Sequence, residues 1–174
     1  MYIKWQPDYD IIRERYPGIE FEKGLRDDIF DSLTPEQRNI LVLDDQIGVV
    51  SSSKSVSDLF TNGSQHRYLI VIYLMNNVYN QEKSQWTISL NSHYSVVFHK
   101  GRDASQFRTM AYQICPSNGH WLVDAYITAT SKPYGYLVLD HHPSTPDNHT
   151  VATNILPGMQ LTYYINSNLK VKSH

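Results

Sequence analysis

The sequence is poor in cysteine, in net charge and in long apolar runs. Cys115 is the one cysteine among 174 residues, so an intrachain disulfide and a zinc site made of several cysteines are both excluded. Charged residues make up 18% and nearly cancel, to a net charge of −2, which is not the composition of a polybasic nucleic-acid-binding chain. No apolar run reaches the roughly 18 residues of a membrane span, and the first residues lack the pattern of a secretion signal. We therefore expect an intracellular protein with no membrane segment.

The length and a hydrophobic content of 41% suit one domain over residues 1–174 that can bury a real core. Apolar runs predict strands, most of them covered on both faces, and patterned segments between them predict helices. The expected strands are 40–43, 68–74, 94–98 and 136–140, with an edge strand within 160–165; the expected helices are 9–16, 54–61, one from Asp103 to Pro116, and 120–130. This alternation predicts an α/β fold with a mainly parallel sheet and flanking helices.

Two adjacent acids end the first of these runs. Ile40-Leu41-Val42-Leu43 leads directly into Asp44 and Asp45. Acids at the end of a buried strand are typical of a Walker B motif, in which the first lies near the Mg²⁺ of a bound nucleotide and the second orients the attacking water. The motif alone has low specificity, because many α/β proteins carry acids at strand ends for capping or solubility.

The order of several short segments supports the nucleotide interpretation. After the acid pair come Asn62-Gly63-Ser64-Gln65-His66-Arg67 and the long apolar strand, then Leu90-Asn91-Ser92-His93, Thr130-Ser131-Lys132-Pro133 and Ser144-Thr145-Pro146-Asp147. This succession resembles the genome-packaging ATPases of the FtsK–HerA superfamily, above all those of adintovirus-like and Polinton-like elements. The resemblance extends from about Trp5 to Pro157. It implies a RecA-like P-loop NTPase core and ATP-driven movement of double-stranded DNA into a capsid by a homo-oligomeric ring.

The resemblance also assigns roles to individual residues. It implies that Asp44 is the Mg²⁺-associated acid and Asp45 the catalytic acid. Arg67 corresponds to an arginine finger that reaches a neighbouring subunit's nucleotide, a role that suits a permanently charged, forked guanidinium, and Arg102 is a second candidate for it. Asn76 stands where the family usually has a sensor glutamine. Mg²⁺ and ATP are thus the implied cofactors, a capsid protein is an implied partner, and the expected location is the cytoplasm, the nucleus or the virion.

The sequence departs from the family at the P-loop. That loop needs Gly-x-x-x-x-Gly-Lys-Ser/Thr, whose amides and lysine hold the phosphates, and the 174 residues contain no Gly-Lys dipeptide. In the family the loop precedes the segment that matches Met1 to Trp5, so the resemblance implies a core without its Walker A strand. The strands at 68–74 and 94–98 would then pair directly, accept another segment, or accept a strand from a second chain. We expect weak or no ATP hydrolysis.

Three functions stay open at this point. One is a truncated or degenerate packaging ATPase, and the second is a repurposed non-catalytic module that oligomerises or binds DNA or a capsid protein. The third is a metal-dependent hydrolase that combines Asp44 and Asp45 with Asp140, His141, His142 and His149, although adjacent histidines in an extended segment point to opposite sides. Contacts to DNA phosphates need no sequence motif; the candidates for them are Lys83, Lys100, Arg102 and Arg108.

Overall fold

The structure is a computed structural model that describes residues 6–24, 37–44, 60, 69–75, 91–99 and 104–166. The chain divides into two compact units, Met1–Asn91 and Ser92–His174, and each is described by itself. The single domain expected over residues 1–174 stays a prediction. Within the described ranges, no helix has both the length and the apolar character needed to cross a membrane.

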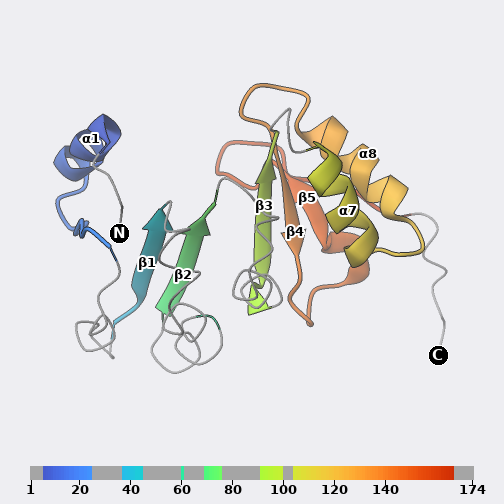
Figure 1. The fold of residues 1–174 in the computed structure, drawn as a ribbon, viewed down its shortest axis with the longest axis horizontal. Helices are drawn as coiled ribbons and strands as arrows, with labels where there is room; N and C mark the ends of the chain where they lie inside the picture. The colour runs from blue at the N-terminus through green and yellow to red at the C-terminus, as the bar shows by residue number, and fades with distance from the viewer. Residues whose placement is uncertain are drawn as a thin grey trace. The chain divides into compact units, whose positions relative to one another are not determined.

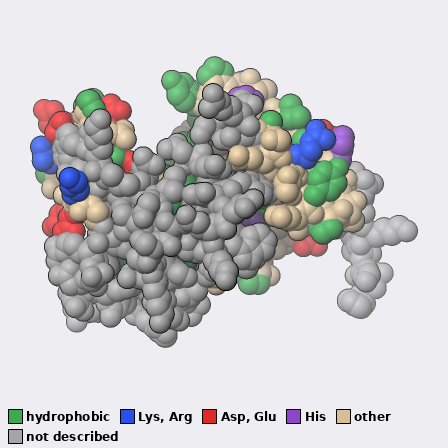
Figure 2. Space-filling model, viewed as in Figure 1, with side chains coloured by type: hydrophobic (Ala, Val, Ile, Leu, Met, Phe, Trp, Pro, Cys, Tyr) green, Lys and Arg blue, Asp and Glu red, His purple; other side chains and the backbone are tan. Residues whose placement is uncertain are grey.

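The first unit begins with a solvent-exposed helix, α1 (Pro7–Arg15). Pro7 suits the first helical position, where an N–H would have no intrahelical partner. Two acids lie in the first turn and two arginines in the last, which complements the partial charges of the helix ends. None of the helix's side chains is buried, and acidic and basic groups are mixed on its surface (Figure 2). The helix expected at residues 9–16 is therefore confirmed, with an earlier start.

The same unit contains a two-stranded parallel sheet made of β1 (Asn39–Asp44) and β2 (Leu69–Leu74) (Figure 1). The register aligns Asn39 with Leu69 and Asp44 with Leu74. Burial alternates along both strands, so the expectation that both faces are covered is wrong here. The exposed apolar side chains share one face of the pair, as the register requires: Ile40, Val42, Ile70, Ile72 and Leu74.

The second unit contains a four-stranded sheet in the order β3-β4-β5-β6. Its strands are β3 (Tyr94–Phe98), β4 (Tyr136–Asp140), β5 (Val151–Thr153) and β6 (Thr162–Tyr163), and each neighbouring pair is antiparallel. The mainly parallel sheet expected from the sequence is therefore wrong for the described strands.

The physical reason lies in the connection from β3 to β4. Two helices, α7 (Ala104–Ile114) and α8 (Gly119–Ala129), separate these strands, whereas a parallel crossover usually contains one. With two, the chain returns to the end of the sheet that it left, and Phe98 pairs with Tyr136. The sequence predicts both of these helices, and the error lies only in the parallel strand direction expected from the alternation of strands and helices.

Both helices cover one face of this sheet (Figure 1). Phe107 and Ala111 of α7 and Leu122 and Tyr126 of α8 form a buried core with the inward side chains of β4 and β5. The rings of Phe107 and Tyr126 stack with 4.1 Å between their centroids. The helix expected from Asp103 to Pro116 is confirmed over Ala104–Ile114, and Ile114 at its end is exposed.

Candidate functional site

Asp44, the sequence's strongest candidate, has a partner from its own chain. It is the last residue of β1 and is half-buried. The phenol of Tyr9, on α1, donates a hydrogen bond to the Asp44 carboxylate, and the Tyr9 ring lies 5.4 Å from the Phe21 ring, centroid to centroid. Hydrogen bonds to ionised carboxylates are among the stronger ones in proteins. Asp44 therefore joins α1 to the carboxyl end of β1.

The described residues around Asp44 do not fit a Mg²⁺-nucleotide site. Mg²⁺ in such sites is held by one or two carboxylates together with substrate phosphates, and the phosphates in turn need the amides and lysine of a P-loop. The carboxylate of Asp44 is engaged by Tyr9, and the 174 residues contain no Gly-Lys dipeptide. No catalytic step can be derived at Asp44 from these groups.

Most other predicted site residues lie outside the described residues. They are Asp45, Arg67 and Asn76 of the expected catalytic set and Lys83, Lys100 and Arg102 of the expected DNA-binding set. Arg108 is described, and its side chain is exposed on α7. The catalytic acid, the arginine finger, the sensor amide and the DNA contacts all stay predictions.

The histidines around the end of β4 are held by local contacts. The Nε2 of His141 lies 3.1 Å from the Oγ of Ser95, and the His141 amide donates to the carbonyl of His93 at 2.8 Å. The ring of His149 packs on Tyr163, with 4.5 Å between centroids. Within the part of the chain that the structure describes, no three His, Cys, Asp or Glu side chains converge as metal ligands would.

Asp140 has a structural role in the loop that follows β4. Its carboxylate accepts hydrogen bonds from the His142 amide and the Thr145 hydroxyl, both at 2.9 Å. Partial removal from water lowers the pKa of His141 from its usual value, while the neighbouring Asp140 carboxylate acts in the opposite direction. The imidazole of His141 is therefore neutral at pH 7, because its ordinary pKa is already about 6.5.

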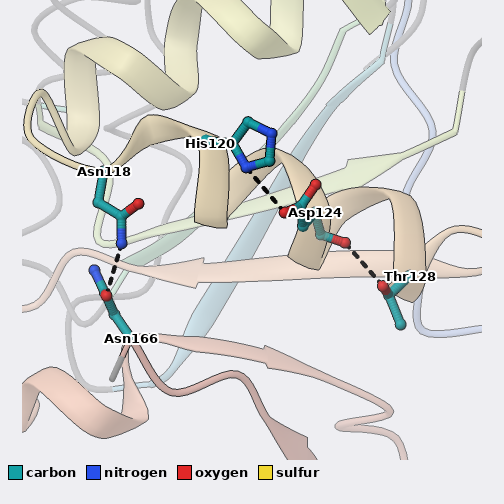
Figure 3. A network of polar contacts seen from close by, with 5 residues as sticks. All are labelled: Asn118, His120, Asp124, Thr128 and Asn166. Carbon is teal, nitrogen blue, oxygen red and sulfur yellow. Dashed lines mark hydrogen bonds and ion pairs between the residues drawn. The ribbon is translucent and has the colours of Figure 1, made fainter. Parts of the chain in front are cut away.

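A pocket of about 190 Å³ lies beside this loop in the second unit. Both helices and both central strands contribute to its lining, which contains apolar and polar residues. The apolar lining is Ile114, Trp121, Leu122, Leu139 and Val151; the polar lining is Cys115, Asp140, His141, Asp147, Thr150 and Asn166. Asn166 is buried and accepts a hydrogen bond of 2.8 Å from Asn118, in the turn before α8 (Figure 3).

The sequence did not indicate a functional role for Tyr9, and among the pocket residues it indicated one only for Asp140 and His141. Tyr9 and Asp44 are 35 positions apart in the sequence, and no local sequence pattern predicts a contact between residues so far apart. Asn166 and Trp121 likewise come from different elements. Asn166 begins the polar segment Asn166-Ser167-Asn168, so no local signal in the sequence indicates that it is buried.

Comparisons of this chain with protein-family models, with curated proteins and with solved structures find no significant match.

Proposed function

We propose that this chain is a degenerate relative of the FtsK–HerA genome-packaging ATPases that hydrolyses ATP weakly or not at all. The observation that carries the proposal is the parallel β1–β2 pair that ends in Asp44, with Tyr9 bonded to that carboxylate. In this interpretation β1 is the Walker B strand, β2 is the neighbouring sensor strand, and a phenol donates to the acid that a Mg²⁺-nucleotide would otherwise approach.

The antiparallel sheet of the second unit departs from that ancestry. The strands expected to flank the Walker A strand, β2 and β3, belong to different described sheets in different units, and their expected direct pairing stays a prediction. The proposal therefore rests on the first unit and on the order of the sequence motifs. Homo-oligomers, double-stranded DNA and a capsid protein are partners that the proposal inherits from the family resemblance.

Binding and turnover of ATP test the proposal directly. The purified chain is assayed for Mg²⁺-dependent ATP hydrolysis beside Asp44→Asn and Asp45→Asn, and its affinity for ATP is measured by calorimetry. We expect no difference in turnover between the chain and either variant. Turnover that Asp45→Asn abolishes would overturn the proposal, because the acid would then act on a correctly held phosphate. An in-frame P-loop in the genomic sequence upstream of Met1 would make the chain a part of an active ATPase.

A specific observation also favours the second candidate, a non-catalytic module that oligomerises. β3 is the last strand on its side of the described sheet, and it exposes Tyr94, Val96 and Phe98. An apolar strand at a sheet edge is a template for pairing with another chain. A second copy of the chain that adds a strand there would form the homo-oligomer.

The mass of the protein in solution tests this second candidate. We expect light scattering to report more than one copy, and Val96→Lys to shift the population toward the monomer, because lysine on an edge strand opposes pairing. Ile127→Lys is the matched control, since Ile127 is also an exposed apolar residue but lies on α8. A monomeric wild-type chain at high concentration would rule out this function.

A further inference from the structure

The size of the pocket in the second unit limits what it can bind. Its volume is about 190 Å³, whereas pockets for drug-sized ligands span about 300–1,000 Å³. The pocket therefore does not enclose a whole nucleotide. A single side chain or a small organic ion of similar bulk fits, and the apolar lining from Leu122, Leu139 and Val151 suits a hydrocarbon stem.

The charges of the lining residues indicate which polar group a ligand in the pocket should carry. Asp140 and Asp147 are the acidic residues of the lining, and neither lysine nor arginine is among the lining residues. Asp140 is occupied by two donors, whereas the Asp147 carboxylate makes no hydrogen bond or ion pair with any residue that the structure describes. The negative end of α7 and the positive end of α8 both border the pocket, and their opposite partial charges offset each other.

We propose that this pocket binds an alkylammonium group, with the ammonium at Asp147 and the hydrocarbon stem against Leu122, Leu139 and Val151. The group is the side chain of a partner protein's lysine or a free small amine; the two share the same chemistry. Trp121 adds an aromatic ring to the lining, and such rings attract cations through their faces. This inference does not depend on the proposed descent from an ATPase.

The experiment is a titration of the full chain with n-butylammonium, followed by amide and indole signals in NMR spectra. We expect saturable shifts at Trp121, Leu122 and Thr150, and weaker binding of n-butanol, which has the stem without the charge. A second arm uses Nα-acetyl-lysine methylamide. Binding at least as tight as that of n-butylammonium assigns the site to a protein lysine, and binding of n-butylammonium alone assigns it to a free amine.

Two matched variants separate the site from general surface charge. Asp147→Asn removes the carboxylate and is expected to weaken n-butylammonium binding by about 1.4- to five-fold, the range for a solvent-accessible ion pair. Asp124→Asn is the control, because Asp124 is an exposed acid on α8 that pairs with His120 at 3.0 Å (Figure 3). Asp124 is not among the residues that line the pocket. Equal effects of both variants, or binding of n-butyrate as tight as that of n-butylammonium, would overturn the proposal.

Discussion

The turn between α8 and β4 holds a tyrosine in a backbone conformation that suits other residues better. The amide of Gly135 donates to the carbonyl of Lys132 at 2.9 Å, which closes a four-residue turn. Pro133, at the second position, fixes φ near −65°, and Tyr134 follows with φ of 61°. A negative φ followed by a positive one defines a type II turn, whose third position favours glycine or asparagine. Tyr134 therefore carries backbone strain.

The variant Tyr134→Asn relieves this strain. The left-handed conformation costs a residue with a Cβ about 1–2 kcal/mol, and asparagine adopts it more readily than most other residues. The Tyr134 side chain is 94% exposed, so its removal sacrifices few contacts. We expect the free energy of unfolding to rise by about 0.5–1 kcal/mol, roughly half of the strain. Urea denaturation followed by circular dichroism measures this as a higher midpoint at an unchanged slope.

The reverse substitution is the control. Asn154 has φ of 58°, so Asn154→Tyr is expected to lower the free energy of unfolding by a similar amount. A fall in stability with Tyr134→Asn, in a chain whose spectrum is otherwise native, would refute the reasoning. It would mean that the tyrosine ring makes a contact in solution that outweighs the strain.

Three further expectations concern the core, the Asp44 contact and pH. Leu137 is fully buried, so Leu137→Ala should lower the free energy of unfolding by about 2–5 kcal/mol, measured in urea. A double-mutant cycle of Tyr9→Phe and Asp44→Ala should give a coupling energy of about 1 kcal/mol, while Tyr16→Phe, at an exposed tyrosine, should change little. Folding lowers the pKa of His141, so the unfolded state binds more protons and stability falls as the pH drops below about 6.5; His141→Gln should flatten that dependence.

The helices of the second unit could be predicted because their local signals agree. Phe107 and Ala111 recur at helical spacing, and Pro116 ends the pattern at a residue where a helix cannot continue. β1 to β4 were predicted because each is a run of apolar residues that also favours extended backbone. The paired acids at the end of β1 could also be found from the sequence, because a change from apolar to acidic residues is visible without any tertiary information.

Strand direction could not be predicted in the same way. The residue composition of β3 and β4 is compatible with parallel and with antiparallel pairing, so it does not predict strand direction. The packing of α7 against α8 decides which end of the sheet the chain returns to. β5 consists of Val151-Ala152-Thr153, which is too short for periodicity to identify. The Asp44 contact and the pocket depend on residues that only the fold brings together, such as Tyr9 with Asp44 and Asp147 with Trp121.

The hydrogen bond from Tyr9 to Asp44 allows two evolutionary interpretations of the Asp44 site to be distinguished. A half-buried carboxylate needs a hydrogen-bond donor, because leaving such a group unsatisfied costs about 1–3 kcal/mol, and the Tyr9 phenol supplies one. If the site is degenerate, Tyr9→Phe lowers stability and creates no affinity for Mg²⁺-ATP. If the phenol instead moves aside for an incoming Mg²⁺, its hydrogen bond competes with the metal, and Tyr9→Phe tightens Mg²⁺-ATP binding. The two interpretations therefore predict different nucleotide affinities for a variant that removes a single oxygen atom.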